Sequence, residues 1–411
     1  MSTVWDQRYA QRVQRIQGSA IRELLKVTEI PGAISLAGGL PAGEIFPLEQ
    51  IAEVTQRILA KQGQQALQYG TTEGYTPLRE LLAQRLTAEG VKASLDNILI
   101  TSGSQQGLDL LGKLFVNPGD PLLVESPTYM GALQAFNPYE PEYVAVRSDN
   151  EGIVTDELEV ALQRHPRCMY VLPSFQNPSG VTFTLERRQQ LIELAARYEM
   201  PILEDDPYSQ LRFEGEQLPS LLALEHQRQQ QLGQGDQFYA GNVILLNTFS
   251  KVLTPGLRVA WIVAPAEVIR KLTLAKQGTD LHTATFNQMI AYELARDGFL
   301  EEHVPVIRAL YRERRDAMLA ALEEYFPDNV SWTHPQGGLF LWVTVPDGID
   351  TAQLLNDALE YRIAFVPGAA FHANGGGANT MRLSFSNVNT EQIEEGIRRL
   401  GKLLHTRMLH V

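Results

Sequence analysis

The sequence is poor in cysteine and in positive charge. Cys168 is the 1 cysteine among 411 residues, which excludes intramolecular disulfides and metal sites built from several cysteines, and we expect no bound metal. The chain has 35 Lys and Arg against 48 Asp and Glu, a formal net charge of −13 with histidine neutral. Nucleic acids and anionic lipid surfaces are bound through clustered basic side chains, so we expect no nucleic acid and no membrane as a partner.

Long apolar runs are also missing. No segment approaches the roughly 18 consecutive apolar residues of a transmembrane helix, and Met1–Arg8 lacks the charged and then apolar pattern of a secretory signal. We therefore expect a cytoplasmic protein. The composition, 44% hydrophobic and 20% charged, is typical of a globular protein with a large core.

The sequence does contain a series of short apolar runs separated by helical patterns. Runs that are apolar throughout are typical of strands buried on both faces of a parallel sheet. Gln105 to Phe115 and Leu185 to Tyr198 have the spacing of helices that cover such a sheet. The alternation predicts an α/β fold. The expected strands are Asn97–Thr101, Pro121–Glu125, Cys168–Leu172, Pro201–Glu204 and Val243–Asn247.

The pattern changes after about residue 300. A charged helix is expected from roughly His303 to Tyr325, followed by an apolar run at 337–345, a further helix and the apolar run Met381–Phe385. These elements predict a smaller α+β domain. The Gln-rich segment Glu225–Gly235 is polar enough that we expect a solvated loop there.

The segment Thr101-Ser-Gly-Ser-Gln-Gln-Gly107 follows an expected strand and opens an expected helix. The unpaired N–H groups and the positive dipole end of a helix start suit a phosphate, and Gly103 permits a tight turn before it. Ser102 and Gln105 also have the spacing of a capping box. An ordinary capped helix is the alternative for this segment taken alone.

The segment Asn247-Thr-Phe-Ser-Lys-Val-Leu-Thr-Pro-Gly-Leu-Arg258 places a lysine where an apolar strand meets a loop. A partly desolvated amine has a lowered pKa and can form a Schiff base. Thr248, Ser250 and Arg258 surround it with donors suited to a phosphate dianion. The alternative is a surface lysine on a loop.

Two further polar segments, Gln176-Asn-Pro-Ser-Gly180 and Glu204-Asp-Asp-Pro-Tyr208, also follow apolar strands. Taken alone, a β-turn explains the first, and a helix cap or a surface charge pair explains the second. Ligand sites of open α/β sheets gather at the carboxyl ends of the strands. Several polar segments at such ends therefore predict one shared site.

In chain order, these motifs resemble the fold-type I pyridoxal-phosphate aminotransferases of class I/II. The resemblance rests on Ser-Gly-Ser-Gln-Gln, Pro-Thr-Tyr, Asn-Pro-Ser-Gly, Asp-Asp-Pro-Tyr and Ser-Lys-x-x-x-Pro-Gly-Leu-Arg, and it runs from about Ala33 to Ser386. Ser19-Ala-Ile-Arg-Glu-Leu and Ile34-Ser-Leu-Ala-Gly-Gly-Leu-Pro41 resemble the branch that contains 2-aminoadipate and kynurenine aminotransferases.

The resemblance implies a fold with a large domain, whose mainly parallel seven-stranded sheet is covered by helices, and a smaller α+β domain. The implied divisions are an N-terminal arm with part of the small domain at 1–46, the large pyridoxal-phosphate domain at 47–300 and the C-terminal small domain at 301–411.

The resemblance also implies catalytic roles for Lys251, Asp205 and Tyr208. Lys251 is implied as the lysine that binds pyridoxal 5'-phosphate as a Schiff base and then moves a proton. Asp205 is implied as the partner of the pyridine nitrogen, because a carboxylate favours the protonated ring that accepts electrons. Asn177 and Tyr208 match the pair that hydrogen-bonds the 3′ oxygen of the cofactor, and Tyr129 matches the ring stacked on the pyridine.

A phosphate cup and a shared active site are implied in the same way. Tyr69 matches a tyrosine that reaches the phosphate of the neighbouring subunit, which implies a homodimer. Threonine stands at position 248, where the family often has serine, and the hydroxyl is kept. The implied phosphate ligands of the subunit itself are Ser104, Gln105, Thr248, Ser250 and Arg258.

Arg382 matches the arginine that holds the substrate α-carboxylate through two parallel N–H donors. The alternative for Arg382 is a strand arginine in a surface ion pair. Arg22 aligns with an arginine that meets an acidic or polar substrate side chain, and Gly39 and Asn177 are expected beside the substrate.

The implied reaction moves an amino group from an L-amino acid to a 2-oxo acid such as 2-oxoglutarate. The donor is 2-aminoadipate, an aromatic or kynurenine-like amino acid, or a branched aliphatic one. One alternative is a pyridoxal-phosphate β-lyase on the same scaffold. The other is the effector domain of a transcription regulator, for which we expect no room before the aminotransferase-like segment.

Overall fold

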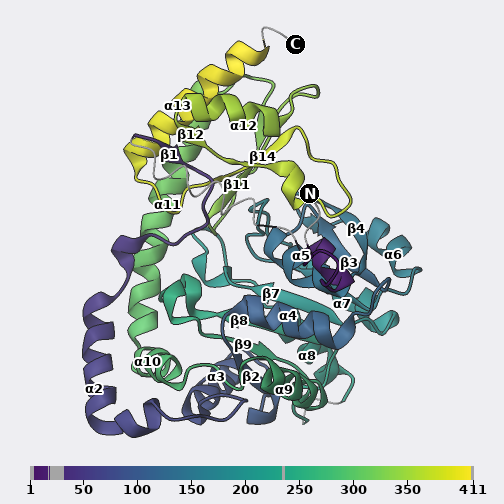
Figure 1. Ribbon diagram of the computed structural model, residues 1–411, viewed down its shortest axis with the longest axis vertical. Helices are drawn as coiled ribbons and strands as arrows, with labels where there is room; N and C mark the ends of the chain where they lie inside the picture. Colours follow the sequence, from purple (N-terminus) through teal and green to yellow (C-terminus); the bar gives the residue numbers. More distant parts are fainter. Residues whose placement is uncertain (1–3, 17, 19–31, 234–236, 409–411) are drawn as a thin grey trace.

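The computed structural model describes residues 4–16, 18, 32–233 and 237–408. These residues form an eight-stranded sheet with helices on both faces, together with a four-stranded and a two-stranded sheet (Figure 1). The described helices include none that is both long and apolar enough to cross a membrane.

The large sheet confirms the expected strands and has one more strand than the expected seven. Its order is β2-β9-β8-β7-β6-β3-β4-β5. Neighbours are parallel except β9, which is antiparallel to β2 and β8, and β5, which is antiparallel to β4. The additional strand is β5, a two-residue strand that pairs with the end of β4 because the chain reverses over Asn150 and Glu151. The strands are β2 (Ile98–Thr101), β3 (Pro121–Ser126), β4 (Glu142–Asp149), β5 (Gly152–Ile153), β6 (Cys168–Val171), β7 (Ile202–Asp206), β8 (Val243–Thr248) and β9 (Ala260–Val263).

Helices cover the two faces of this sheet. The helices α4 (Ser104–Phe115), α5 (Met130–Phe136) and α9 (Ala266–Asp280) pack with Leu203 in one apolar cluster, and α7 (Leu185–Arg197) and α8 (Leu221–Gln231) pack with Ile202 in another. Successive side chains of a strand point to opposite faces. Asp205 therefore lies on the α4 face of β7, and Asp206 lies on the α8 face.

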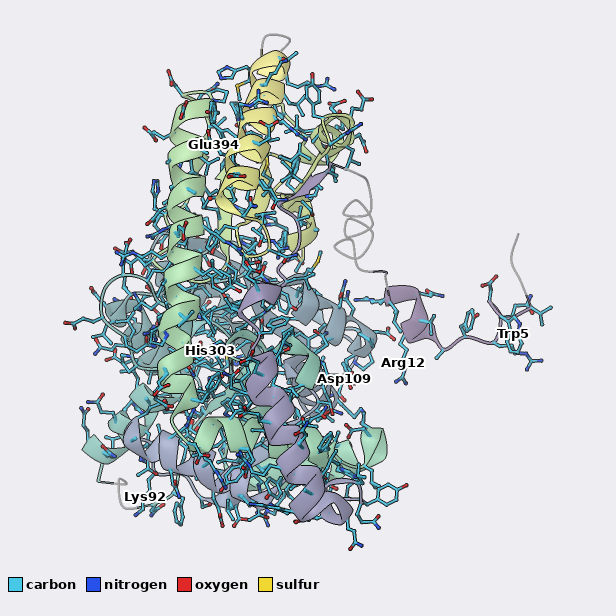
Figure 2. The ribbon with its side chains drawn as sticks, turned by 90° about the vertical axis from the view of Figure 1, so that its left-hand side faces the viewer. Trp5, Arg12, Lys92, Asp109, His303 and Glu394 are labelled. Carbon is cyan, nitrogen blue, oxygen red and sulfur yellow. The ribbon has the colours of Figure 1, made fainter. Side chains whose placement is uncertain are left out.

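The remaining elements build the upper part of the molecule in Figure 1 and the side of the large sheet. The long helix α11 (Phe299–Tyr325) runs beside α13 (Thr390–Met408), as the labels His303 and Glu394 show in Figure 2. The four-stranded sheet has the order β10-β11-β14-β13, and β1 pairs in parallel with β12. The other bounds are β1 (Ile34–Ser35), α2 (Leu48–Ala66), α3 (Thr76–Ala88), α6 (Thr155–Leu162), α10 (Thr285–Arg296), β10 (Ser331–Trp332), β11 (Phe340–Thr344), α12 (Thr351–Glu360), β12 (Ile363–Ala364), β13 (Val366–Pro367) and β14 (Thr380–Ser384).

The Gln-rich segment differs from the expectation. The solvated loop expected at Glu225–Gly235 is wrong for the larger part of that segment, because α8 continues to Gln231. Glu225 is buried, and its carboxylate accepts hydrogen bonds from the Tyr239 hydroxyl and the Val243 N–H group. These donors come from a later part of the chain, so composition alone does not show that the polar group can be buried.

Candidate active site

The polar ends of β7 and β8 meet around one lysine. Lys251 is the last residue of the short helix η7 (Phe249–Lys251), directly after β8. Its amine donates to the Gly39 carbonyl at 3.3 Å and lies 5.8 Å from the centre of the Tyr208 ring. Removal from solvent, together with repulsion from two nearby guanidinium groups, lowers the pKa of Lys251 to about 8. An amine with this pKa is available as a base and nucleophile near neutral pH.

Asp205 faces the same site from β7 and is only 2% exposed. One of its carboxylate oxygens accepts a hydrogen bond from the Tyr170 hydroxyl at 2.9 Å. The other oxygen is buried and has no partner among the described residues. Burial raises the pKa of Asp205 to about 7. A buried acceptor without a donor is costly, and the implied cofactor would supply the missing donor through a protonated ring nitrogen.

Arg382 on β14 is a buried cation that has no anionic partner among the described residues. Its guanidinium donates to Asn177 Oδ1 at 2.8 Å and to the Ala37 carbonyl at 2.6 Å, and it lies 4.3 Å from the centre of the Phe340 ring. Its Nε is buried without a hydrogen bond, and no described carboxylate pairs with it. Burial lowers the pKa of Arg382 to about 10. The alternative of a surface ion pair is therefore wrong, and the group can receive a ligand carboxylate.

Three aromatic or amide side chains line the same space. Asn177 and Tyr208 are buried and hydrogen-bonded to each other. Tyr129 directly precedes α5. Burial raises the pKa of Tyr208 and of Tyr129, and the negative charge of Asp205 raises both further. Both phenols therefore stay protonated at neutral pH and can donate hydrogen bonds.

The start of α4 and the loop after β8 form a cup for an anion. Ser104 is the first residue of α4, and its hydroxyl is buried without a described partner. A Cβ at Gly103 would lie 1.9 Å from a terminal nitrogen of Arg258, so glycine is required for the guanidinium to approach the helix start. The hydroxyls of Thr248 and Ser250 are 2.9 Å apart beside it. A helix start, hydroxyls and a guanidinium are the donor set that a phosphate dianion takes.

Two side chains before and within α4 have contacts other than those expected. The Gln105 amide donates to the Gly131 carbonyl at 2.8 Å. The expected capping box is wrong, because Gly103 is the N-cap and no side chain caps the helix. The Ser102 hydroxyl instead donates to Asp280 at 3.0 Å, since α9 brings that carboxylate next to the loop.

Two other predicted site residues are not found in the cluster around Lys251. The Tyr69 side chain is 79% exposed and packs edge-on against His282 with ring centres 5.8 Å apart. Arg22 lies outside the described residues.

Sequence reasoning missed Tyr170 and Phe340. A tyrosine in an apolar strand needs a partner for its hydroxyl, and this signal could have identified Tyr170. Phe340 lies edge-on to Tyr208 at 6.0 Å, and a Cβ added to Gly39 would lie 2.7 Å from its ring. Nothing in the apolar run 337–345 distinguishes Phe340 from its neighbours.

Comparison with known proteins agrees with this geometry. The family model described as aminotransferase class I and II matches residues 32–400. The chain is 47% identical to aromatic-amino-acid aminotransferase 1 of Thermococcus litoralis, over 98% of this chain and 95% of that protein. It is 47% identical to the 2-aminoadipate transaminase of Thermus thermophilus, over 97% of each.

A solved structure also shows similarity to an aminotransferase. The α-aminoadipate aminotransferase LysN of Thermus thermophilus, complexed with N-(5'-phosphopyridoxyl)-L-leucine, is similar with a TM-score of 0.91 and 45% identity over 100% of both chains. The buried oxygen of Asp205 and the buried hydroxyl of Ser104, neither with a partner among the described residues, fit such a cofactor together with the amine of Lys251. The chain therefore belongs to the class I and II aminotransferase family, has its fold-type I architecture, and is a pyridoxal-phosphate-dependent aminotransferase.

Proposed function

We propose that this enzyme moves the amino group of 2-aminoadipate, an aromatic or kynurenine-like amino acid, or a branched aliphatic amino acid to a 2-oxo acid such as 2-oxoglutarate. The observation that carries the proposal is Arg382, a buried guanidinium near Lys251 with no described carboxylate partner. Amino acids and 2-oxo acids both present a carboxylate next to the reacting carbon, and a fixed guanidinium positions that carbon for both half-reactions. The names of the aromatic and 2-aminoadipate relatives support this range of donors.

We assign the proton transfers to Lys251. Bound pyridoxal phosphate supplies an electron-accepting ring that stabilises the charge left when the substrate Cα loses its proton. With a pKa of about 8, the Lys251 amine can take that proton and return it. Asp205 would hold a proton on the pyridine nitrogen through the oxygen that has no partner among the described residues. Tyr208 and Asn177 would bind the 3′ oxygen of the cofactor, and Asn177 also orients Arg382.

The other proposed contacts are with the ring of the cofactor, with the substrate and with the phosphate group. Tyr129 would hold the face of the pyridine ring, and Gly39 would lie beside the substrate because its carbonyl accepts from Lys251. Gln105 contributes its N–H group at the helix start, since its side chain donates to Gly131. The proposed phosphate ligands are Ser104, Gln105, Thr248, Ser250 and Arg258.

We also propose a homodimer in which Tyr69 completes the active site of the partner subunit. The 79% exposure of Tyr69 supports this role, because most of its surface is open to contact with another subunit. Mixing inactive Lys251→Ala subunits with inactive Tyr69→Ala subunits should restore part of the activity, since some dimers then contain one intact site. Full activity in a monomer, measured by sedimentation, would contradict the proposal.

The domain division and the location are part of the same proposal. The arm and part of the small domain are 1–46, the large domain is 47–300 and the small domain is 301–411. The pairing of β1 with β12 and the start of α11 at Phe299 support these boundaries. A cytoplasmic location is compatible with the buried free thiol of Cys168 and can be checked by cell fractionation.

A donor panel tests the proposed reaction. The holoenzyme is assayed with 2-oxoglutarate and L-2-aminoadipate, L-phenylalanine, L-kynurenine or L-leucine, and glutamate formation is measured. Glutamate from at least one donor is expected, and L-aspartate serves as a comparison donor. Release of pyruvate and ammonia from a β-substituted amino acid, without glutamate from any donor, would instead identify a β-lyase.

A further inference from the structure

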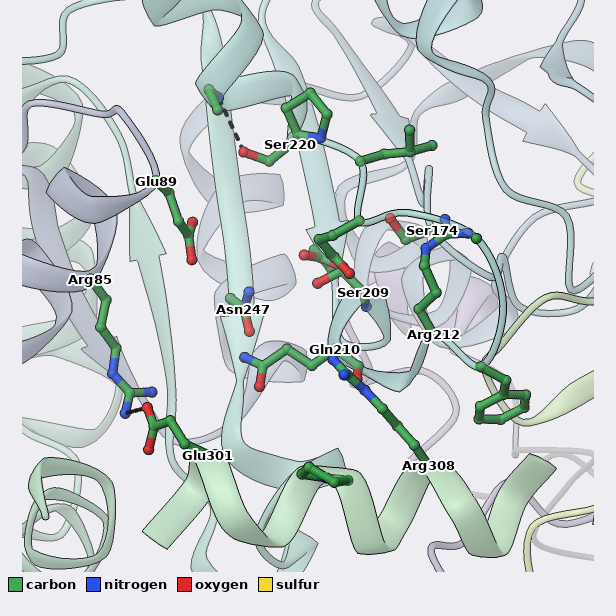
Figure 3. Close-up of a pocket in the computed structure, with 18 of the residues that line it drawn as sticks. Arg85, Glu89, Ser174, Ser209, Gln210, Arg212, Ser220, Asn247, Glu301 and Arg308 are labelled. Carbon is green, nitrogen blue, oxygen red and sulfur yellow. Dashed lines mark hydrogen bonds and ion pairs between the residues drawn. The ribbon is translucent and has the colours of Figure 1, made fainter. Parts of the chain in front are cut away.

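A further cavity lies on the α8 face of the large sheet, whereas Asp205 faces Lys251 from the α4 face. Figure 3 shows this cavity. Its volume is about 1390 Å³, and its walls come from the end of α3, the ends of β7 and β8, the segment before α8, and α11. Asp206 and Asn247 line this cavity, whereas their neighbours Asp205 and Thr248 face the cofactor side because strand side chains alternate. None of the residues that we assign to the active site lines it.

One wall of the cavity carries negative charge. Glu89 points into the cavity toward Asn247 (Figure 3), and the carboxylate of Asp206 is close enough to repel it. The Glu89 carboxylate has no hydrogen bond or ion pair within the described ranges. The Arg85 guanidinium lowers its pKa through charge attraction but pairs with Glu301 at 3.1 Å. Two carboxylates that repel each other across a cavity are stabilised by a cation between them.

Asp206 also has no ion pair in the part of the chain that the structure describes. Arg188 lies nearby, but its guanidinium donates to the carbonyls of Phe183, Pro173 and Pro219 and to the Ser174 hydroxyl. Burial raises the pKa of Asp206, and the N–H group of Ser209 donates to it at 3.0 Å. Among the described residues, neither Asp206, which is buried, nor Glu89, which is exposed to solvent, forms an ion pair.

A positive charge enters the same cavity from α11. Arg308 reaches from this helix into the cavity, and its Nε donates to the Gln210 carbonyl at 2.6 Å (Figure 3). No carboxylate pairs with its guanidinium among the described residues. Removal from solvent lowers the pKa of Arg308, and no nearby acid offsets this effect. The same cavity has apolar lining at Phe213, Leu218, Ala223, Pro305 and Ala309.

We propose that this cavity binds a zwitterionic α-amino acid with an apolar side chain, its ammonium group between Glu89 and Asp206 and its carboxylate at Arg308. A simple anion would meet the two carboxylates, and a simple cation would meet the guanidinium, so both are disfavoured. The apolar lining takes the side chain. This site is separate from the active site, and its existence does not depend on the donors proposed above.

The test requires an enzyme whose active site cannot take a free amino acid. The protein is loaded with reduced phosphopyridoxyl-L-leucine, which fills the cofactor and substrate positions, and L-leucine is titrated by calorimetry. Saturable binding of one further leucine per subunit is expected. N-acetyl-L-leucine, which lacks the ammonium group, and L-leucinamide, which lacks the carboxylate, should each bind about tenfold more weakly or less.

Variants locate the site. Glu89→Gln should weaken leucine binding about tenfold and remove the discrimination against N-acetyl-leucine, whereas Arg308→Gln should remove the discrimination against leucinamide. Glu302→Gln and Arg270→Gln, which change exposed charges away from the cavity, should leave binding unchanged. The proposal is overturned if the loaded enzyme does not bind leucine, or if both cavity variants bind it as the unaltered protein does. The analogues test the same assignment should a variant fail to fold.

Discussion

The ammonium group of Lys276 lies 2.7 and 2.9 Å from the two carboxylate oxygens of Asp280, and Lys276 is 0% exposed on α9. The same carboxylate accepts hydrogen bonds from the Ser102 hydroxyl at 3.0 Å and from the Gln106 amide at 2.6 Å. The Ser102 carbonyl in turn accepts from Arg258. This pair therefore anchors the loop in front of α4 and, through it, the proposed phosphate cup.

Replacing Lys276 by methionine should loosen that cup. Breaking a buried pair leaves one charge uncompensated, although Asp280 is partly exposed, so we expect a loss of about 1–3 kcal/mol of stability. Pyridoxal phosphate should dissociate about tenfold faster, as followed by absorbance after dilution. Lys271→Met, at an exposed position of the same helix, is the control. An unchanged dissociation rate in Lys276→Met would show that the pair does not support the cup.

The rate at which the apoenzyme captures pyridoxal phosphate should depend on the protonation of Lys251. Only the neutral amine is a nucleophile, and burial lowers the pKa of Lys251 from 10.5 to about 8. The capture rate should therefore rise between pH 7 and pH 9 and level off above the pKa. Stopped-flow absorbance measures it. A midpoint near 10.5 would mean that this amine is not desolvated.

Tyr170→Phe should move the acidic limb of the pH–rate profile. The hydroxyl donates to Asp205 at 2.9 Å and so lowers the pKa of that carboxyl group, which burial raises to about 7. Without the hydroxyl the pKa rises further, so the ionised form and the activity are reached at a pH about one unit higher. Tyr198→Phe, in the segment after α7, should leave the profile unchanged. A profile of Tyr170→Phe that matches the unaltered enzyme would contradict the role of Asp205.

Arg382→Lys should affect substrates rather than the cofactor. Lysine cannot form two parallel hydrogen bonds to a carboxylate, so we expect KM to rise about 100-fold for the amino donor and for the 2-oxo acid. Cofactor absorbance should be retained. Arg147→Lys, at an exposed arginine paired with Glu157 at 2.8 Å, serves as the control. A normal KM for both substrates would remove Arg382 from carboxylate binding.

Much of the fold could be predicted because its signals are local. Strands that are apolar throughout mark a sheet covered on both faces, and this pattern correctly located β2, β3, β6, β7 and β8. The positions of Lys251, Asp205, Asn177 and Arg382 followed from short motifs in a characteristic order. The antiparallel direction of β9 and the short strand β5 did not follow, since both depend on pairing between segments.

The contacts that tune the site could not be predicted. Tyr170 meets Asp205 only because β6 and β7 are neighbours in register. Phe340 lies against Arg382 only because β11 and β14 are neighbours in the four-stranded sheet. The Gln-rich end of α8 is helical because distant donors satisfy Glu225. Each case depends on a partner far away in the chain.

The sequence by itself determined the order of strands and motifs along the chain, the residue types of the site and a formal net charge of −13. These properties can be read from the sequence because they depend on residue types and on residues that are adjacent in the chain. Only the tertiary structure decided which charges remain without partners. Within the described residues, it buried Arg382 without a carboxylate partner and left one oxygen of Asp205 without a donor. It also placed Asp205 and Asp206 on opposite faces of one strand, because burial and pairing are set by segments that meet in space.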